Sequence, residues 1–316
     1  MKYIFTLVLC CFFYCGLSQE KFNAAFIFKT DNDLYASKSK DRYYTSGVFL
    51  KYRYLTKNEN PKLEKRILEW QIGHKMYTPS NATVPNKLFH DRPFAGYLYG
   101  SFAIDQVYKN KQILNTTLQI GVLGPNAFGK ELQNFIHDIY GFKKAVGWKH
   151  QIKNAFAINF NASYSKELAK DKRNYFDISW INAGKIGTVF TNLSSGFYTR
   201  MGFKPLQSIV NSIAFNTNLN NDNTSFERKR EAFVYVKTTF NYTLYDATLQ
   251  GSFLNTGSEV TKELKPFHFG VEIGLQFTMN RFYIGYAYLY HGEKSKGLKY
   301  TGGNYYGSIS LNYLFR

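Results

Sequence analysis

A histidine and a glutamine four residues apart are the first candidates for chemistry in this sequence. Gln133 and His137 lie in the segment from Glu131 to Tyr140, whose apolar residues recur at helical spacing. Residues four apart share one face of a helix, so the amide and the imidazole point the same way. An imidazole can take a proton from water. The pair therefore suggests a hydrolytic site, although a single histidine on a helix is more often structural.

A run of acidic and amide side chains supplies a second candidate. Asp31, Asn32 and Asp33 are consecutive and close the first predicted strand. Carboxylate and amide oxygens, together with backbone carbonyls, can hold a hard cation such as Ca²⁺. A bound cation can polarise an ester carbonyl and stabilise the oxyanion that forms. Such a run is also common in ordinary turns, so by itself it does not define a metal site.

Motifs of other enzyme classes are absent from the sequence. There is no Gly-x-Ser-x-Gly elbow, no His-Glu-x-x-His motif and no P-loop. The three cysteines all fall within the first 15 residues, so the rest of the chain has no thiol for catalysis, metal binding or a disulfide. The 40 Lys and Arg exceed the 22 Asp and Glu by 18, which suggests an anionic partner. We do not expect this partner to be nucleic acid, because the N-terminal segment predicts export and the rest of the chain predicts membrane strands.

The N-terminal segment predicts export. Met1 and Lys2 form a short basic start, Tyr3 to Leu17 is almost unbroken apolar sequence, and Gly16 to Ser18 allows cleavage before Gln19. We expect residues 1–18 to be a signal peptide and residues 19–316 to form a single domain. A membrane anchor is a weaker alternative, because the apolar run is shorter than the roughly 20 residues that a spanning helix needs.

Alternation with a period of two dominates the remaining chain. From Phe267 to Thr278 every odd position is large and apolar, and every even position is polar or glycine. Similar segments are about 9–14 residues long, as tilted membrane-spanning strands are, whereas strands of a soluble β-sandwich are usually shorter. The sequence therefore predicts an antiparallel transmembrane β-barrel in a bacterial outer membrane. The predicted strands are 22–31, 44–56, 66–78, 94–107, 112–124, 150–163, 173–184, 188–203, 232–244, 246–254, 264–278, 280–290 and 303–316.

This set of thirteen strands is odd, whereas bacterial single-chain barrels normally have an even number. Successive connections in a barrel alternate between its two ends. The short connections at 109–111, 184–187, 244–246 and 280 follow the fourth, seventh, ninth and eleventh predicted strands. They can all face the periplasm only if one strand between Leu123 and Gly184 is miscounted. The long basic connections are expected to be solvated loops or a rim that meets phosphates. These connections are 163–173, 205–231 and 291–303.

Five motifs follow one another in the first half of the mature chain. They are Asn32-Asp33, Asp41 with Tyr44-Thr45-x-Gly47, Asp91-Arg92-Pro93-x-Ala95-Gly96-x-Leu98-Tyr99, Gly124-Pro125 with Gln133-x-x-x-His137, and Gly147-Trp148-x-x-Gln151. In their order and spacing they resemble the outer-membrane lipid A 3′-O-deacylase family. The resemblance implies a barrel of about twelve strands with one short helix in a rim loop. It also implies Ca²⁺-dependent hydrolysis of the 3′-acyloxyacyl ester of lipid A in the outer leaflet, by a protein expected to be monomeric.

The resemblance also implies roles for particular residues. His137 is the base that activates water, Gln133 helps to orient it, Asn32 and Asp33 belong to the metal and oxyanion region, Thr45 lines the site, and Arg92 lies near the lipid A phosphates. Phe94 and Tyr97 stand where Tyr and Trp are commoner in the family, and Ser46 stands where Asn is. These departures leave the proposed chemistry in place but bear on substrate preference.

Two other functions fit the same barrel. A porin-like or structural outer-membrane protein could retain the motif residues for packing, in which case the polar side chains should be scattered in space. An outer-membrane phospholipase would differ from a lipid A deacylase only in its substrate.

Overall fold

Twelve strands form a closed antiparallel barrel in this computed structural model, which describes residues 21–36, 42–225 and 230–316. The predicted signal peptide and Asp41 lie outside these residues. The strands are β1 Ala24–Asn32, β2 Tyr43–Thr56, β3 Leu63–Thr78, β4 Ala95–Tyr108, β5 Gln112–Leu123, β6 Ala155–Lys170, β7 Phe176–Gly187, β8 Phe190–Gly202, β9 Ala232–Asp246, β10 Phe267–Met279, β11 Phe282–His291 and β12 Asn304–Phe315.

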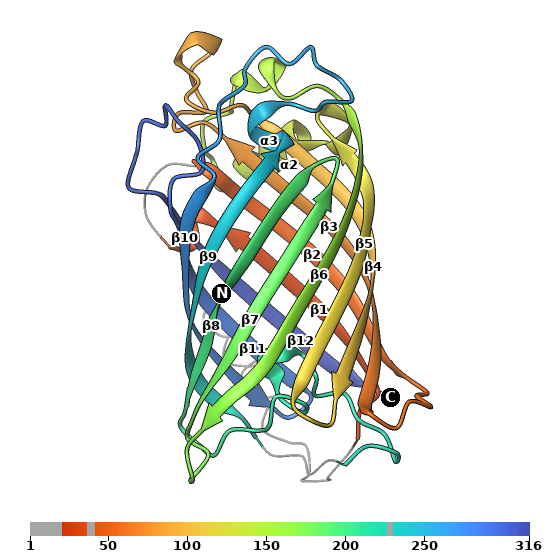
Figure 1. Cartoon of the computed structure of the whole chain (residues 1–316). Coiled ribbons are helices and arrows are strands. Elements are labelled where there is room, and N and C mark those ends of the chain that lie inside the picture. Colours follow the sequence, from red (N-terminus) through yellow and green to blue (C-terminus); the bar gives the residue numbers. More distant parts are fainter. Residues whose placement is uncertain (1–20, 37–41, 226–229) are drawn as a thin grey trace.

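Pairing of the first and last strands closes the barrel. β1 pairs with β2 on one side and with β12 on the other, in register from Ala24 with Phe315 to Asn32 with Gly307. Each remaining strand pairs with its neighbours in sequence, so the wall has no free edge (Figure 1). This architecture confirms the predicted all-β barrel of about twelve strands.

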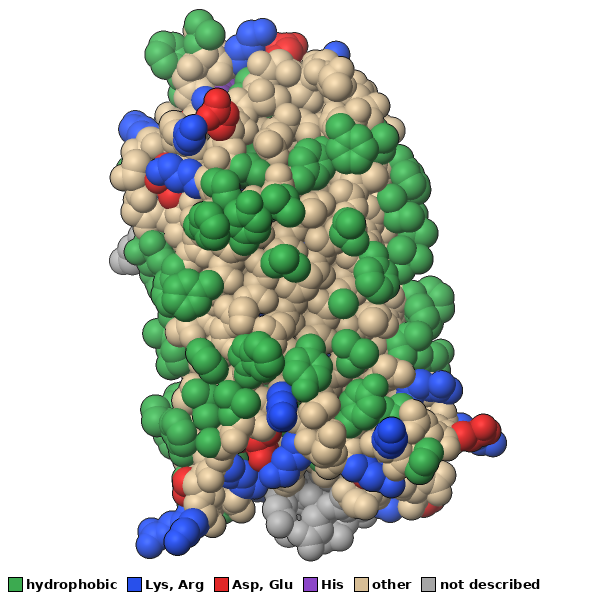
Figure 2. All heavy atoms as spheres, viewed as in Figure 1, with side chains coloured by type: hydrophobic (Ala, Val, Ile, Leu, Met, Phe, Trp, Pro, Cys, Tyr) green, Lys and Arg blue, Asp and Glu red, His purple; other side chains and the backbone are tan. Residues whose placement is uncertain are grey.

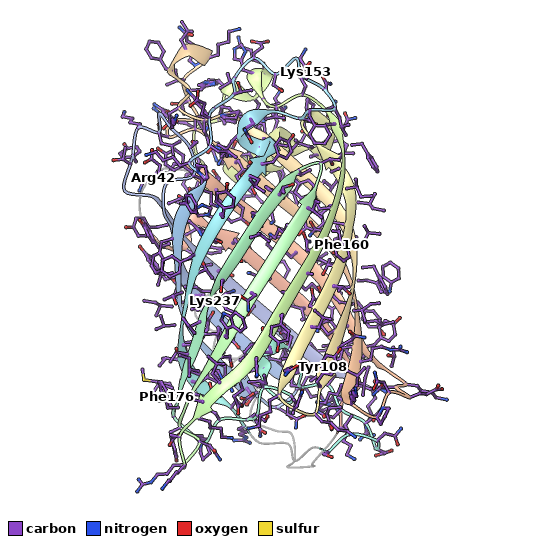
Figure 3. The ribbon with its side chains drawn as sticks, in the orientation of Figure 1. Arg42, Tyr108, Lys153, Phe160, Phe176 and Lys237 are labelled. Atoms are coloured by element: carbon purple, nitrogen blue, oxygen red, sulfur yellow. The ribbon has the colours of Figure 1, made fainter. Side chains whose placement is uncertain are left out.

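The wall presents apolar side chains outward and polar ones inward. On β10, Ile273 is 52% exposed, whereas the adjacent Glu272 accepts a hydrogen bond of 2.6 Å from the Tyr235 hydroxyl inside the barrel. Apolar side chains cover the middle of the visible wall, and charged ones gather toward its two ends (Figure 2). Phe160 of β6 lies at mid-height of the wall (Figure 3) and is 49% exposed. This is the arrangement that a barrel surrounded by lipid requires.

Among the residues that the structure describes, two short helices lie in the loops. The predicted helix is confirmed as α2, Gly129–Tyr140, and a single-turn helix, α3, spans Ala247–Gln250. Neither of them, nor any other helix of the described residues, has the length and apolar character to cross a membrane.

The miscounted strand is the segment 246–254, and not one between Leu123 and Gly184 as the turns suggested. β9 continues through the supposed turn to Asp246, whose carboxylate then accepts the Thr248 N–H and begins α3. Asp is a favoured N-cap residue because its side chain satisfies an amide at the start of a helix. The connection after β7 is only residues 188–189, and it lies at the end of the barrel opposite to the expected one.

Loop length distinguishes the two ends of the barrel. The end that carries α2 has the connections 33–42, 79–94, 124–154, 188–189, 247–266 and 292–303. The other end has the connections 57–62, 109–111, 171–175, 203–231 and 280–281. Periplasmic turns are mostly short and extracellular loops mostly long, so the α2 end is the extracellular one. The connections 188–189 and 203–231 are the exceptions to this pattern.

This assignment corrects the predicted basic rim. Of the three long basic connections that were predicted, only the last, which the structure bounds as 292–303, joins strands at the α2 end. Most of the predicted loop 163–173 belongs to β6, where Lys166 pairs with Gln112 of β5 and Lys170 pairs with Asp177 of β7. The backbone pairing of β6 thus continues beyond the apolar band of the wall. The lysines in this part of the strand are solvated, which is why the sequence pattern predicted a loop.

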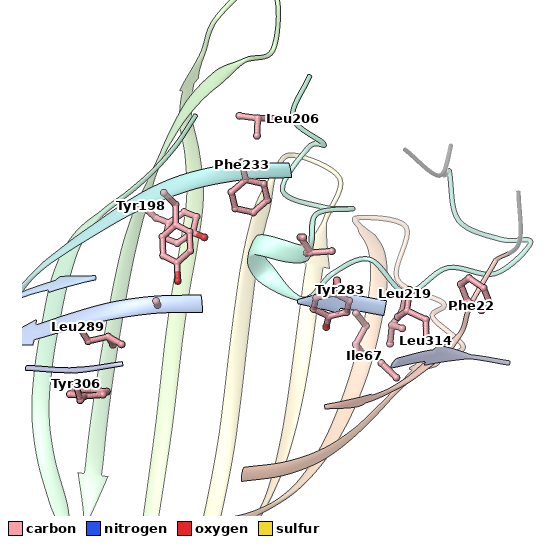
Figure 4. Packing of buried hydrophobic residues seen from close by; sticks show 14 residues of the cluster. Phe22, Ile67, Tyr198, Leu206, Leu219, Phe233, Tyr283, Leu289, Tyr306 and Leu314 are labelled. Carbon is pink, nitrogen blue, oxygen red and sulfur yellow. The ribbon is translucent and has the colours of Figure 1, made fainter. Parts of the chain in front are cut away.

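The long segment 203–231 fills the opposite mouth of the barrel. Its side chains Leu206, Ile213 and Leu219 pack in one buried cluster with Ile67 of β3 and Phe233 of β9 (Figure 4). A buried core therefore lies across that mouth of the barrel.

A candidate active site on the outer wall

The helix α2 is fixed against the outer surface of β3 and β4. Gly96 of β4 faces outward, and a Cβ placed there would lie 3.2 Å from the Ala127 Cβ and 3.3 Å from the Gly129 Cα. The His74 imidazole on β3 lies 2.8 Å from the Ala127 carbonyl oxygen, and the Gly124 amide donates to the Gly96 carbonyl at 2.9 Å. The absence of a side chain at Gly96 therefore permits this close approach.

A small apolar cluster packs between the helix and the wall. It consists of Met76, Ala82, Phe94, Ala145 and Trp148, with Leu132 of α2 packed against it. Gly147 is needed in this cluster, because a Cβ there would lie 2.4 Å from the Phe94 ring. The Gly-Trp motif thus holds an indole beneath the helix.

Trp148 fixes the orientation of Gln133. Its indole Nε1 donates a hydrogen bond of 2.6 Å to the Gln133 side-chain oxygen. Both side chains are almost fully buried, at 1% and 2% exposed. The sequence had placed Trp148 in a motif without giving it a role, and its contact with Gln133 supplies one.

His137 occupies the last turn of α2 and is held from the loop that follows. Its Nδ1 lies 2.7 Å from the Lys143 carbonyl oxygen, an acceptor, so the neutral ring carries its proton on Nδ1 and its basic lone pair on Nε2. Gly141 ends the helix with a φ of +70°, a conformation that glycine adopts readily, and turns the chain back toward the ring. Phe142 packs edge-on against the imidazole.

The faces of α2 are reversed relative to a helix on a soluble protein. Gln133 and His137 are buried, whereas Phe135 and Ile139 are 62% and 63% exposed. Leu132 and Ile136, the other apolar residues at helical spacing, are half-buried. A helix that exposes its apolar residues beside an apolar wall is suited to a lipid surface.

Asn32 and Asp33 lie where β1 ends and the 3-10 turn η2, Asp33–Tyr35, begins. The Asn32 side-chain oxygen accepts the Leu34 amide at 2.8 Å, and Asp33 Oδ2 accepts the Arg42 amide at 2.8 Å. Asp31 lines the lumen, so strand alternation places the Asn32 side chain on the outer face. Asp33 is 4% exposed.

Thr45 belongs to the same outer face. Its hydroxyl lies 2.7 Å from the hydroxyl of Thr78 on β3, beside a register shift between Tyr44 and Ser46. Tyr77 lines the lumen, so strand alternation places the next side chain, Thr78, on the outer face. Because its hydroxyl contacts that of Thr45, Thr45 lies on the outer face too. Thr78 was missed from the sequence, where the Pro that follows it marks only a strand end.

Arg92 lies on the other side of the wall. It lines the lumen, is 6% exposed, and donates through Nη2 to the carbonyl oxygen of Thr248 at 3.1 Å and to its hydroxyl at 3.0 Å. Its guanidinium also lies 4.6 Å from the centre of the Tyr77 ring. Burial lowers the pKa of Arg92, an effect opposed by the nearby Asp246 carboxylate. Arg92 therefore does not share the outer face with the other predicted residues.

The neighbouring Asp91 organises the loops around the site. Its carboxylate accepts the Tyr43 hydroxyl at 2.9 Å, the Ser80 amide at 2.8 Å and the Lys299 amide at 3.0 Å. These bonds tie the loop 79–94 to the start of β2 and to the loop that follows β11. The Asp-Arg pair of the sequence motif thus has a structural role that sequence reasoning did not assign.

The donors near Asn32 and Asp33 fit a hard cation in type. Among the residues that the structure describes, no group of three or more His, Cys, Asp or Glu side chains could hold a metal ion. A cation here would thus depend on the single carboxylate of Asp33, the Asn32 amide oxygen and backbone carbonyls. Oxygen ligands of this kind are those that Ca²⁺ takes.

Comparison with known proteins identifies relatives of this barrel. A family profile described as "Outer membrane protein LpxR" matches residues 5–315. The solved structure of LpxR from Salmonella typhimurium superimposes with a TM-score of 0.73 at 20% sequence identity, covering 92% of this chain and 100% of that one. An outer membrane channel from Pseudomonas putida F1 is less similar, with a TM-score of 0.45 at 6% identity, covering 96% of this chain and 98% of that one. No curated protein matches the sequence.

Proposed function

The chain belongs to the LpxR family of outer membrane proteins, and from this premise we propose that it is an esterase that removes the 3′-acyloxyacyl group of lipid A. Lipid A forms the outer leaflet of the outer membrane, so its acyl esters lie beside the extracellular half of the barrel wall. An enzyme that acts on them needs its reactive groups outside the barrel, at that height.

The reversed helix α2 is the observation that carries this proposal. It turns Gln133 and His137 toward the outer wall and exposes Phe135 and Ile139. Asn32 on β1, and Thr45 on β2 with its hydroxyl partner Thr78 on β3, lie on the outer face at the same end of the barrel as α2. A porin gains nothing from polar side chains on its lipid-facing wall, where each of them needs a hydrogen-bond partner.

The reaction follows from the protonation state of His137. With its proton on Nδ1 and bonded to Lys143, the imidazole accepts a proton from water at Nε2. The water then attacks the ester carbonyl, and the imidazolium returns the proton to the leaving alkoxide. Gln133, held by Trp148, positions the ring and the water, and Thr45 lines the pocket that receives the ester.

Asn32 and Asp33 are proposed to hold Ca²⁺ beside the reacting ester. The bound ion would polarise the carbonyl and stabilise the oxyanion. The predicted contact between Arg92 and lipid A phosphates is not part of this proposal, because Arg92 lines the lumen and does not face the outer wall.

Mass spectrometry of lipid A from cells tests the proposal. Cells that express the protein should contain lipid A that has lost the mass of one acyloxyacyl group, and cells without it should not. Cells that express His137→Ala at equal level should match those without the protein. Unchanged lipid A in membranes that contain folded wild-type protein and Ca²⁺ would refute the proposed activity.

A further inference from the structure

A cavity of about 420 Å³ occupies the upper lumen, on the opposite side of the wall from the candidate active site. Lys29 and Asp31 of β1 line it, whereas strand alternation places Asn32 on the outer face. Leu249, Leu264 and Leu298 from the extracellular loops line its upper part. The cavity is therefore separate from the site proposed for lipid A.

Cationic side chains dominate the lining of this cavity. They are Lys29, Lys51, Lys75, Lys185, Lys294 and Arg92. Two of these lysines have carboxylate partners, since Lys29 lies 3.6 Å from Asp31 and Lys51 lies 2.9 Å from Glu69. The Glu293 carboxylate is already bound to Lys265.

The other three lysines have no such partner. Within the described part of the chain, the ammonium groups of Lys75, Lys185 and Lys294 make no ion pair and no hydrogen bond. The nearby Asp246 carboxylate accepts the amide and the hydroxyl of Thr248 through Oδ1, at 2.9 and 2.6 Å, and makes no ion pair with these lysines.

These unpaired cations converge on one place. Lys75 and Lys185 lie 5.7 and 5.8 Å from the centre of the same ring, that of Phe190. Lys75 also interacts unfavourably with the charges of Lys185 and Lys294. The free energy of such a cluster falls when an anion enters, because each ammonium then gains an acceptor and the repulsion is offset.

Arg92 adds a directed donor to this cluster. Its Nη2 is bonded to Thr248, but its buried Nε has no acceptor among the described residues. A buried guanidinium N–H without an acceptor is costly, and an anion in the cavity would satisfy it.

We propose that the upper lumen binds a phosphate-class anion through Lys75, Lys185, Lys294 and the Nε of Arg92. Several oxygens on one anion can accept from ammonium groups that approach from different strands, which a monatomic anion does less well. Because the wall is closed, a lipid in the bilayer cannot reach this cavity sideways. The occupant is therefore a free anion that enters past the extracellular loops.

Calorimetric titration of the full-length, refolded protein with inorganic diphosphate at low ionic strength tests the proposal. Wild type should bind saturably at one site. Lys75→Gln combined with Lys185→Gln should lower the association constant at least tenfold, because two charge-assisted hydrogen bonds to the anion are lost. Lys237→Gln is the matched control, because Lys237 is a luminal lysine with a carboxylate partner, Glu272, at 3.8 Å, and its loss should change the constant less than about twofold.

Two results would overturn the site. One is the absence of saturable binding to wild type, and the other is an equal loss in Lys237→Gln, which would indicate a diffuse positive potential. Adding bisphosphorylated lipid A to the micelles should not displace diphosphate, and displacement would contradict a free-anion occupant. Deacylation is assayed in parallel, so failure of this site and failure of the proposed activity give different results.

Discussion

At the scale of single residues, the carbonyl oxygen of Lys143 decides which nitrogen of His137 is basic. Because Nδ1 donates to this oxygen, the lone pair is on Nε2, and the ring can act as a base without turning. The sequence could predict that His137 and Gln133 share a face. It could not predict that Lys143 and Trp148 fix them, because both contacts depend on how the loop 141–151 folds back beneath α2.

His137→Ala should therefore abolish nearly all activity without loss of the barrel. The loss of a general base costs on the order of 10²–10⁴ in rate. The side chain contributes to neither the strand pairing nor the lipid-facing wall, so the variant should insert normally. The measurements are the rate of lipid A deacylation by purified protein and the heat-modifiable mobility of the folded barrel.

A second residue-scale prediction concerns the proposed cation. Asp33→Asn removes the carboxylate but keeps similar shape, so it should weaken Ca²⁺ activation, and more Ca²⁺ should be needed for half-maximal rate. Chelation should stop the wild-type reaction, and added Ca²⁺ should restore it. Full activity of wild type in excess chelator would show that no divalent cation takes part.

At the scale of elements, the close approach of α2 to β4 carries the site. A Cβ at Gly96 would press on Ala127 and Gly129, so Gly96→Val should push the helix outward. A displacement of about 1 Å can cost on the order of 10²-fold in rate. Gly100→Val is the matched control, since it lies on the same face of the same strand and its nearest neighbour is the Gln71 carbonyl oxygen at 4.0 Å. Equal deacylation rates in the two variants would show that the helix position does not matter.

The lipid-facing wall makes a different prediction. Ile273→Arg places a charge at the middle of β10 on the outer face, where it should lower the free energy of folding into the bilayer by about 2–4 kcal/mol. Glu272→Gln, on the luminal face, keeps an acceptor for Tyr235 and should cost much less. Folding titrations in lipid vesicles measure both, and similar sensitivity at the two positions would indicate a core on both faces.

The elements show where sequence patterns are sufficient and where they are not. Alternation predicted the strands well, because a wall between lipid and a polar lumen imposes a period of two. It failed at Asp246, where polar and apolar residues still alternate but the aspartate caps a helical turn instead. It also ended β6 too early, because the pairing of Lys166 and Lys170 with their neighbours does not need an apolar face.

At the scale of the whole molecule, the barrel is closed at the end opposite α2. Arg200 of β8 is fully buried and bound to Asp177, and it also donates to the Gln207 carbonyl oxygen at 2.9 Å. Glu231 in turn accepts the Ile213 amide at 2.8 Å. These contacts depend on how the segment after β8 folds into the barrel mouth, so they could not be predicted from a sequence that looked like a solvated basic loop.

The closed end predicts that the protein does not conduct ions. Replacing residues 207–229 with a short Gly-Ser linker should leave a folded barrel that forms open channels in planar bilayers, whereas wild type should show no conductance. Steady wild-type conductance comparable to that of the deletion variant would mean that 203–231 does not seal the lumen.

The buried ion pair at this end predicts a loss of stability. Arg200→Ala, which leaves Asp177 buried without its partner, should cost about 3–5 kcal/mol of stability.

The central claim is that the outer-wall site hydrolyses the 3′-acyloxyacyl ester of lipid A, and one measurement tests it most directly. Purified protein is incorporated with Ca²⁺ into vesicles that contain both lipid A and phospholipid, and mass spectrometry follows both lipids over time. We expect lipid A to lose the acyloxyacyl group from the 3′ position while the phospholipid stays intact, and the His137→Ala protein to leave both unchanged. Formation of lysophospholipid with intact lipid A, or equal deacylation by His137→Ala, would contradict the account.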